Sequence, residues 1–210
     1  GRYFLSEVKF DDIDGDKKPE GFLYFYSTGT AAEQNLYIYK IVNELWKEIF
    51  VLQSPGNLDY GRFKFKYIGD YKVSFYDKKY DLKATIELDK NNYIDMEDML
   101  TYISDWVDPE ASIEIKDIDN DGIKEIIANQ RVIGIAHTDI IGYLDTTYKL
   151  IGSGYEAVKI TLSNINNELI IEKSIDDDWQ EFLQSLENRV INFFLPRLIK
   201  YLIRIYIIKL

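Results

Sequence analysis

The sequence predicts a mainly β protein, an antiparallel meander of short strands, and three observations support this. The chain has 210 residues, 46% hydrophobic and 15% aromatic, so it can bury a substantial core. Its 17 tyrosines and many isoleucines favour strands, because aromatic and branched side chains fit a pleated surface. The run RFKFKYI (62–68) alternates charged and apolar residues, which is typical of a half-buried antiparallel strand.

Strand-like runs separated by turn residues fill most of the chain up to residue 175. They occupy residues 3–10, 22–26, 35–52 (two strands around a turn at Asn43–Glu44), 62–68, 71–77, 82–88 and several segments between 112 and 174. The segment 94–106 is ambiguous, since its apolar residues Met96, Met99, Leu100 and Ile103 also fit one face of a helix.

From about residue 176 the apolar residues recur at helical spacing, and Pro196 should end or kink that helix. We therefore expect a β-rich domain over 1–175 with two similar halves, 1–110 and 111–175. The segment 176–210 is expected to form a C-terminal helix and a basic, apolar tail packed on the domain. An interfacial membrane segment is the alternative for that tail.

The charge balance narrows the classes of partner. Against 25 Lys and Arg stand 36 Asp and Glu, a net charge of -11, which argues against nucleic acid and suits metal cations. The chain has no cysteine, so it has no disulfide frame, thiolate zinc site or cysteine nucleophile. No apolar run reaches the ~20 residues that span a bilayer. The chain starts at Gly1 rather than Met, and we expect any export signal to have been removed.

The motif that carries most chemistry occurs twice, in KFDDIDGDKKPEGF and EIKDIDNDGIKEII, each time after a strand-like run. The acids share the spacing D-x-D-x-D-x-x-x-E at an offset of 105 residues, as Asp12, Asp14, Asp16 and Glu20 in the first copy and Asp117, Asp119, Asp121 and Glu125 in the second. Carboxylates at alternate positions of a tight loop converge, and Ca²⁺ takes about 6–8 oxygen ligands. The main-chain carbonyls of Lys18 and Ile123, at position 7 of the loops, would add one ligand each. The sequence therefore predicts two Ca²⁺ sites.

Other ions and other calcium motifs fit these loops less well. Mg²⁺ keeps its waters and seldom fills an all-protein cage, while zinc prefers nitrogen or sulfur and the chain has one histidine. An EF-hand needs an acid at position 12, where this chain has Leu23 and Ala128, and it needs flanking helices instead of strands. A calcium sensor is therefore not expected. An acidic surface turn without an ion is the remaining alternative.

An acid at position 9 followed by an apolar strand resembles the calcium loops of FG-GAP and VCBS repeats, as in integrin-α-type propellers. The segment WVDPEASIEIKDIDNDGIKEIIANQRVIGIAHTDIIGYL is similar to VCBS-repeat surface proteins and lipoproteins of Gram-positive bacteria. Lys17 and Pro19 depart from that pattern. The resemblance implies a propeller-like meander, with calcium fastening the turn between neighbouring strands. At about 40–50 residues per blade the chain has room for at most four blades, and an open sheet or a sandwich is the alternative.

The resemblance also implies an extracellular or surface-anchored location and a protein or glycan as partner. The expected function is thus a non-catalytic, calcium-stabilised binding or structural module. The alternative is a hydrolase, glycosidase-like or other, that uses His137 and nearby acids such as Asp139, since histidine changes charge near neutral pH. No nucleophile elbow or phosphate-binding loop accompanies His137.

Overall fold

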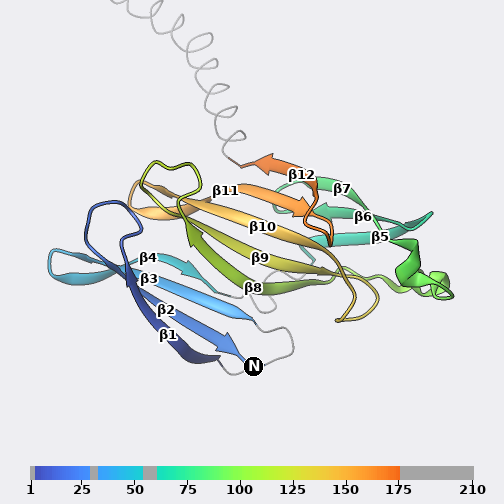
Figure 1. Cartoon of the computed structure of the whole chain (residues 1–210), viewed down its shortest axis with the longest axis horizontal. Helices are drawn as coiled ribbons and strands as arrows, with labels where there is room; N and C mark the ends of the chain where they lie inside the picture. The colour runs from blue at the N-terminus through green and yellow to red at the C-terminus, as the bar shows by residue number, and fades with distance from the viewer. Residues whose placement is uncertain (1–2, 29–32, 54–60, 176–210) are drawn as a thin grey trace, which may run out of the picture. The chain divides into compact units, whose positions relative to one another are not determined.

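The computed structural model describes residues 3–28, 33–53 and 61–175 (Figure 1). The chain divides into two compact units, Gly1–Lys173 and Ser174–Leu210. The expected helix from residue 176 and the tail 196–210 lie outside the described residues. Within the described ranges, no helix has both the length and the apolar character needed to cross a membrane.

The prediction of a mainly β, antiparallel fold is confirmed, since the described residues form twelve strands in three antiparallel sheets. The N-terminal sheet contains β1 (Tyr3–Asp11), β2 (Glu20–Ser27), β3 (Gln34–Val42) and β4 (Leu45–Leu52) in that order. The small sheet contains β5 (Phe63–Gly69), β6 (Lys72–Asp77) and β7 (Leu82–Glu87). The long sheet has the order β12 (Leu169–Ser174), β11 (Gly154–Ser163), β10 (Ile140–Ile151), β9 (Glu125–Ile133), β8 (Val107–Lys116).

The ambiguous segment 94–106 lies between the small and long sheets and contains no long helix. Two short 3₁₀ helices, η2 (Lys90–Tyr93) and η3 (Glu97–Tyr102), lie in and just before it. They bury only Tyr93 and Leu100, which join the core beside the small sheet. The described residues thus form three open sheets, and no closed ring of blades is found among them.

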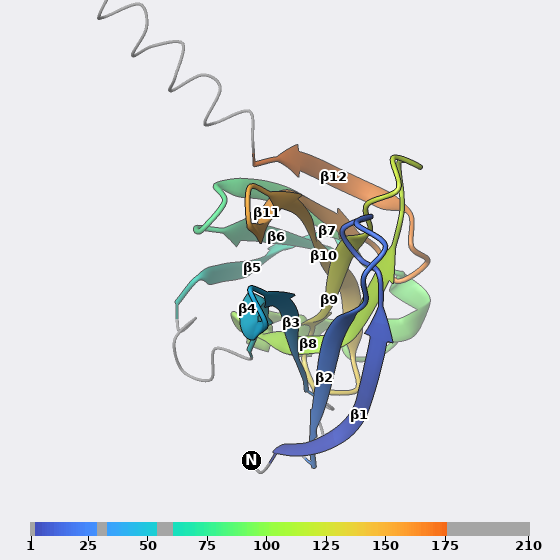
Figure 2. The same ribbon diagram turned by 90° about the vertical axis from the view of Figure 1, so that its left-hand side faces the viewer.

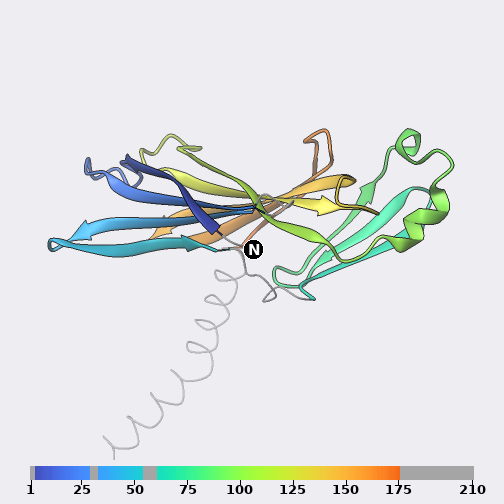
Figure 3. The ribbon, with the colours of Figure 1, turned by 90° about the horizontal axis from the view of Figure 1, so that it is seen from below.

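Both smaller sheets pack on one face of the long sheet, at different ends (Figure 3). On β9, Ile126 and Ala128 pack with the N-terminal sheet, and Val132 packs with the small sheet. These positions point to one side, because alternate residues of a strand share a face. The buried side chains of β2 and β3, among them Phe22 and Ile38, complete the first core. The packing places β1–β4 against β8–β11.

Strands β1–β4 and β8–β11 are two copies of one meander, matched residue by residue. The β1–β2 pairing shifts register between Leu5 and Glu7, and the β8–β9 pairing shifts at the corresponding place, between Glu110 and Ser112. The second irregularity also recurs, at Tyr39 in the β3–β4 pair and at Tyr148 in the β10–β11 pair. The first hairpins correspond at an offset of 105 residues, and the later strands correspond at 109. The chain therefore contains a structural duplication, with one acid loop in each copy.

Candidate metal centre

The two acid loops connect β1 to β2 and β8 to β9, and they lie side by side at one end of the paired sheets (Figures 1 and 2). The carbonyl oxygen of Ile13 accepts hydrogen bonds from the Lys124 N–H (2.8 Å) and from the Tyr155 hydroxyl (3.2 Å). The same hydroxyl lies 3.0 Å from the Lys124 carbonyl oxygen. A Cβ on Gly15 would stand 2.9 Å from the Gly122 oxygen. The two loops are thus in direct contact.

Both loops use the same unusual backbone conformation at positions 4 and 6. Position 4 is Gly15 (φ 76°) in the first loop and Asn120 (φ 62°) in the second. Position 6 is Lys17 (φ 68°) and Gly122 (φ 90°). Residues with these positive φ angles are in the left-handed conformation and reverse the direction of the chain. Glycine and asparagine adopt this conformation at low cost. Lys17 takes it without that advantage, so the loop as a whole must favour it.

The acids at positions 1, 3, 5 and 9 hold this conformation by accepting main-chain hydrogen bonds. Asp12 accepts from the N–H groups of Gly15 and Lys17, both at 2.8 Å. In the second loop, Asp117 accepts from Asp121 at 3.2 Å and from Gly122 at 3.0 Å. The other three acids make matching bonds, namely Asp14 from Asp16 (3.3 Å), Asp16 from Lys18 (2.8 Å), Glu20 from Ile13 (3.0 Å), Asp119 from Asp121 (3.3 Å), Asp121 from Ile123 (2.7 Å) and Glu125 from Ile118 (2.8 Å).

Three of the four acids in each loop converge. Oxygen atoms of Asp12, Asp14 and Glu20 all lie within 4.8 Å of one another, and so do those of Asp117, Asp119 and Glu125. Asp16 and Asp121 lie outside these groups of three and remain predicted ligands. The main-chain carbonyls of Lys18 and Ile123 likewise remain predicted ligands, because the hydrogen bonds given above involve the N–H groups of these two residues and not their carbonyl groups.

The acid at position 9 is the most deeply buried of each set. Glu20 is 0% exposed and Glu125 is 2% exposed. One Glu20 oxygen binds the Ile13 N–H, whereas the other, Oε1, is buried without a hydrogen-bond partner. Burial raises the pKa of Glu20, and the nearby Asp14 charge acts in the same direction. A buried, unsatisfied carboxylate oxygen is costly, and a cation among the converging acids would satisfy it.

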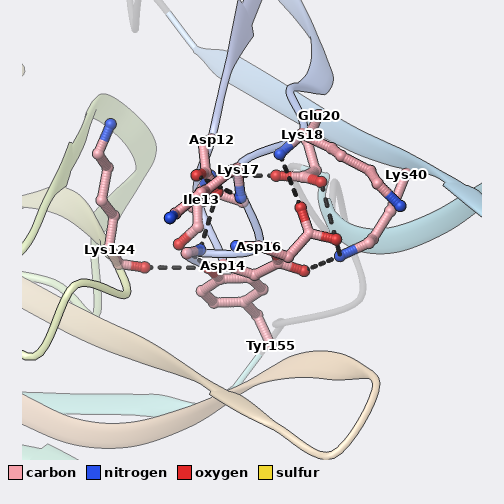
Figure 4. Close-up of polar contacts among 11 residues, drawn as sticks. Asp12, Ile13, Asp14, Asp16, Lys17, Lys18, Glu20, Lys40, Lys124 and Tyr155 are labelled. Carbon is pink, nitrogen blue, oxygen red and sulfur yellow. Dashed lines mark hydrogen bonds and ion pairs between the residues drawn. The ribbon is translucent and has the colours of Figure 1, made fainter.

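One lysine reaches into each group of acids. Lys40 of β3 contacts Asp14, and its Nζ lies 2.8 Å from Asp16 Oδ2 and 3.8 Å from Glu20 Oε1 (Figure 4). Lys149 of β10 contacts Asp119, and its Nζ lies 3.3 Å from Glu125 Oε1. The register makes the two lysines equivalent, because Tyr39 and Tyr148 occupy the same place in the two meanders.

The ion pairs raise the pKa of both lysines and lower the pKa of one acid in each loop, Asp16 and Asp119. Burial alone would lower the pKa of Lys40, but its hydrogen bonds to Asp14 and Asp16 outweigh that effect and raise it. The hydrogen bond from Lys40 also keeps the pKa of Asp16 below its usual value. In the second loop the bond between Lys149 and Asp119 raises the pKa of the lysine and lowers that of the acid. Each loop therefore carries an internal monovalent cation.

The roles of Lys40, Lys149 and Tyr155 were not predicted from the sequence. The lysines could have been found from a short repeated pattern, YKIV at 39–42 and YKLI at 148–151. That pattern recurs at 109 residues rather than at the 105 of the acids, because β9 (9 residues) and β10 (12 residues) are together four residues longer than β2 (8 residues) and β3 (9 residues). No comparable signal marks Tyr155, whose role depends on the contact between the two loops.

His137 lies away from both loops, in a polar cluster at the other end of β8 and β9. Its Nε2 lies 3.0 Å from Oδ2 of the buried Asp108, and its ring stacks on Trp106 with centroids 5.2 Å apart. Asp108 Oδ2 also lies 2.7 Å from Arg131 Nη2. Asp139 accepts from the Tyr93 hydroxyl at 2.7 Å and from the Ile135 N–H at 2.8 Å. Both of the proposed hydrolytic groups are thus held by neighbours within the fold.

Fold and site together define a class, an antiparallel β protein in which a duplicated meander carries paired acidic loops. Within that class, residues 61–163 match a family model described as the YybI C-terminal domain. The match includes the second acid loop and not the first. The chain is similar to the "Uncharacterized protein YybI" of Bacillus subtilis (strain 168), with 24% identity over 165 residues, 75% of this chain. The chain spans 62% of the length of that relative. No solved structure matches the chain.

Proposed function

We propose that the protein is a non-catalytic, calcium-stabilised module that holds one Ca²⁺ in each acid loop. The observation that carries the proposal is the unsatisfied Oε1 of Glu20, buried among converging carboxylates. The duplication supports it, since two loops of different sequence keep the same acids, the same hydrogen bonds to the acids at positions 3, 5 and 9 and positive φ angles at positions 4 and 6. The resemblance of the loops to FG-GAP and VCBS repeats points the same way.

The chemistry of the donors suits calcium. All the converging side-chain atoms are carboxylate oxygens, the ligands preferred by hard divalent cations. Each loop has four acids, and one lysine pairs with three of them in the first loop and with two in the second, so its single positive charge offsets only part of the negative charge. A divalent ion would bind the remaining oxygens and displace the ammonium group. Because the lysine competes, we expect an affinity of about 10⁻⁴–10⁻³ M, the range of extracellular calcium modules.

In this proposal the metal has a structural role. Ca²⁺ in the first loop would fasten the β1–β2 hairpin, whose loop touches the second loop through Ile13 and Lys124. Two bound ions would thereby stabilise the contact between the N-terminal and long sheets. The propeller-like arrangement and the surface location are further parts of the proposal, drawn from the resemblance, and so is a protein or glycan as the partner. The hydrolase alternative has no specific support, because His137 and Asp139 are engaged by neighbouring side chains.

Calorimetric titration with Ca²⁺ and thermal melting test the proposal. The wild-type chain should bind two ions, Asp14→Ala and Asp119→Ala should each bind one, and the double variant should bind none. Saturation of one site at 100 times its Kd adds about 2.7 kcal/mol to the free energy of unfolding, so EDTA should lower the Tm. Glu87→Gln, at an exposed acid outside the loops, is the matched control. A wild-type chain that neither binds Ca²⁺ nor responds to EDTA would refute the proposal.

A further inference from the structure

The face of the N-terminal sheet that points away from the long sheet is largely apolar and exposed. Alternation along the strands places Val8, Phe10, Ile41 and Trp46 on this face, and they are 48%, 63%, 52% and 55% exposed. Single exposed apolar residues are ordinary, but a contiguous apolar patch of this kind on a soluble protein marks an interaction site.

The duplication shows what this face is built to contact. The residues of this outer face correspond, in the duplication, to the residues of the long sheet against which the N-terminal sheet packs. The corresponding pairs are Phe10 and Ile115, Gly21 and Ile126, Leu23 and Ala128, Tyr39 and Tyr148, Ile41 and Leu150, and Trp46 and Tyr155. All six residues of the long sheet belong to the core between the two sheets or pack against it. In this repeat, therefore, this is the face on which another sheet lies.

The face of the long sheet that points away from the N-terminal sheet is polar. The inner face of the N-terminal sheet carries Tyr24, Leu36, Ile38, Phe50 and Leu52. At the corresponding positions the long sheet has Asn129, Asp145, Thr147, Lys159 and Thr161. Burial raises the pKa of Asp145, which accepts a hydrogen bond from Asn129 at 2.7 Å. Such a face does not fit an apolar sheet.

Of the four faces of the two meanders, two are buried against each other, one is polar and one is apolar and exposed. A second copy of the chain offers the same set. Among the described residues of two such copies, the surface that matches this apolar face is the same face of the other copy, and a surface that pairs with itself gives a closed two-fold dimer. We propose that the outer face of the N-terminal sheet is the interface between two copies of this chain, packed back to back.

The shape and size of the face suit this contact. It contains a hollow of about 300 Å³ lined by Val8, Phe10, Gly21, Leu23, Tyr39 and Trp46. Gly21 forms the floor, since a Cβ there would lie 3.3 Å from the Trp46 ring, and one large side chain of the partner copy would fit above it. Four strands about 4.8 Å apart and roughly seven residues long present ~400 Å² of flat sheet. The side chains add accessible surface to this area, and a standard interface buries ~800 Å² per partner.

The proposed dimer uses the opposite side of the sheet from Phe22 and the core, and we expect it to form with or without calcium, although one edge of that side adjoins Lys18, Pro19 and Glu20 of the first acid loop. Sedimentation velocity from micromolar to submillimolar protein tests it. The wild-type mass should rise from the monomer value of 24.7 kDa to twice that value, with or without EDTA. Phe10→Lys combined with Ile41→Lys should remain monomeric, because two charges would be buried in the interface. Ile68→Lys, at an exposed apolar residue of β5 (53%), should dimerise like the wild type.

A second measurement keeps the test valid if the double variant does not fold. The chain has no cysteine, so a spin label at Ile41→Cys reports one site only. Pulsed dipolar spectroscopy should give a distance between the two copies that is shorter for Ile41→Cys than for Ile68→Cys. A wild-type chain that stays monomeric throughout overturns the proposal. A folded double variant that still dimerises, or labels at Ile41 that show no coupling, would also overturn it.

Discussion

The first and second acid loops reach the same geometry from different sequences and in different surroundings. Position 6 is lysine in one and glycine in the other, and position 8 is Pro19 in one and Lys124 in the other. Position 2 differs most in environment, since Ile13 is 0% exposed and Ile118 is 44% exposed. The acids at positions 1, 3, 5 and 9 and the left-handed positions 4 and 6 are what the two loops share.

The difference in surroundings follows from the stacking of the two meanders. The first loop lies between the sheets, where Ile13 joins the core and its carbonyl binds Lys124 and Tyr155. The second loop has no third meander to cover it within the described residues. A proline at position 8 lacks an N–H, so Pro19 cannot donate the bond that Lys124 makes. The same motif thus packs between the two meanders in the first copy and lies at the edge of the pair in the second.

The largest contrast between the loops is expected at position 2. Ile13→Ala removes a fully buried side chain and should lower the free energy of unfolding by about 2–5 kcal/mol. Ile118→Ala removes a half-exposed side chain and should cost no more than about 0.5 kcal/mol. Urea unfolding in the presence of EDTA measures both without a contribution from metal. Equal losses at the two positions would show that the first loop is not the buried member of the pair.

The next contrast concerns the lysines. Lys40→Met should tighten Ca²⁺ binding at the first loop roughly tenfold, which equals about 1.4 kcal/mol, because the competing ammonium is gone. Lys149→Met should have a smaller effect. The Lys40 and Asp14 side chains are only 20% and 11% exposed, whereas those of Lys149 and Asp119 are both 42% exposed and better screened by water.

The same substitutions should have the opposite effect without metal. In EDTA, Lys40→Met should lower the Tm, since Asp14, Asp16 and Glu20 then lose the ammonium group that pairs with them. Lys66→Met, at an exposed residue of β5, controls for the loss of one positive charge. Calorimetry that finds weaker Ca²⁺ binding in Lys40→Met would mean that the lysine supports the metal site instead of competing with it.

The parts of the fold that follow from local patterns were predictable from the sequence. The turn at Asn43–Glu44 was predicted, and both residues have positive φ angles of 51° and 66° in the β3–β4 hairpin. The strand at 62–68 was read from its alternation, which appears as alternate burial along β5. The acid spacing also located both loops, because the ligands of a tight turn lie close together in sequence.

What depends on contacts between distant segments was not predictable. Lys40 and Lys149 reach the acids from a strand that returns to the loop, so their distance from the acids in sequence hides them. The division into three open sheets depends on which strand faces Phe22 or Val132 across the core, and periodicity shows only that such residues are buried. The ambiguity at 94–106 has a similar cause. Its apolar residues fit a helix, yet the segment is broken into short turns around Tyr93 and Leu100.

The smallest expected contrast is at position 6, and it isolates the backbone. Lys17 (φ 68°) and Gly122 (φ 90°) occupy the same left-handed position, which costs a non-glycine residue about 1 kcal/mol or more. Lys17→Gly should therefore raise the free energy of unfolding by about 0.5 kcal/mol, after the greater freedom of glycine in the unfolded chain is subtracted. Gly122→Ala should lower it by about 1 kcal/mol.

The effect of Gly122→Ala includes no steric clash, since a Cβ at Gly122 meets no atom within 4 Å. Its cost must come from the backbone alone. Denaturant unfolding with EDTA present measures both changes in the free energy of unfolding. A glycine at Lys66 would not be a suitable control, because glycine weakens the interior of a strand. Lys18→Gly, next to the tested position and without a positive φ angle, is the proper one and should destabilise. If Lys17→Gly destabilises as much as Lys18→Gly, the lysine side chain stabilises the loop by more than its backbone conformation costs.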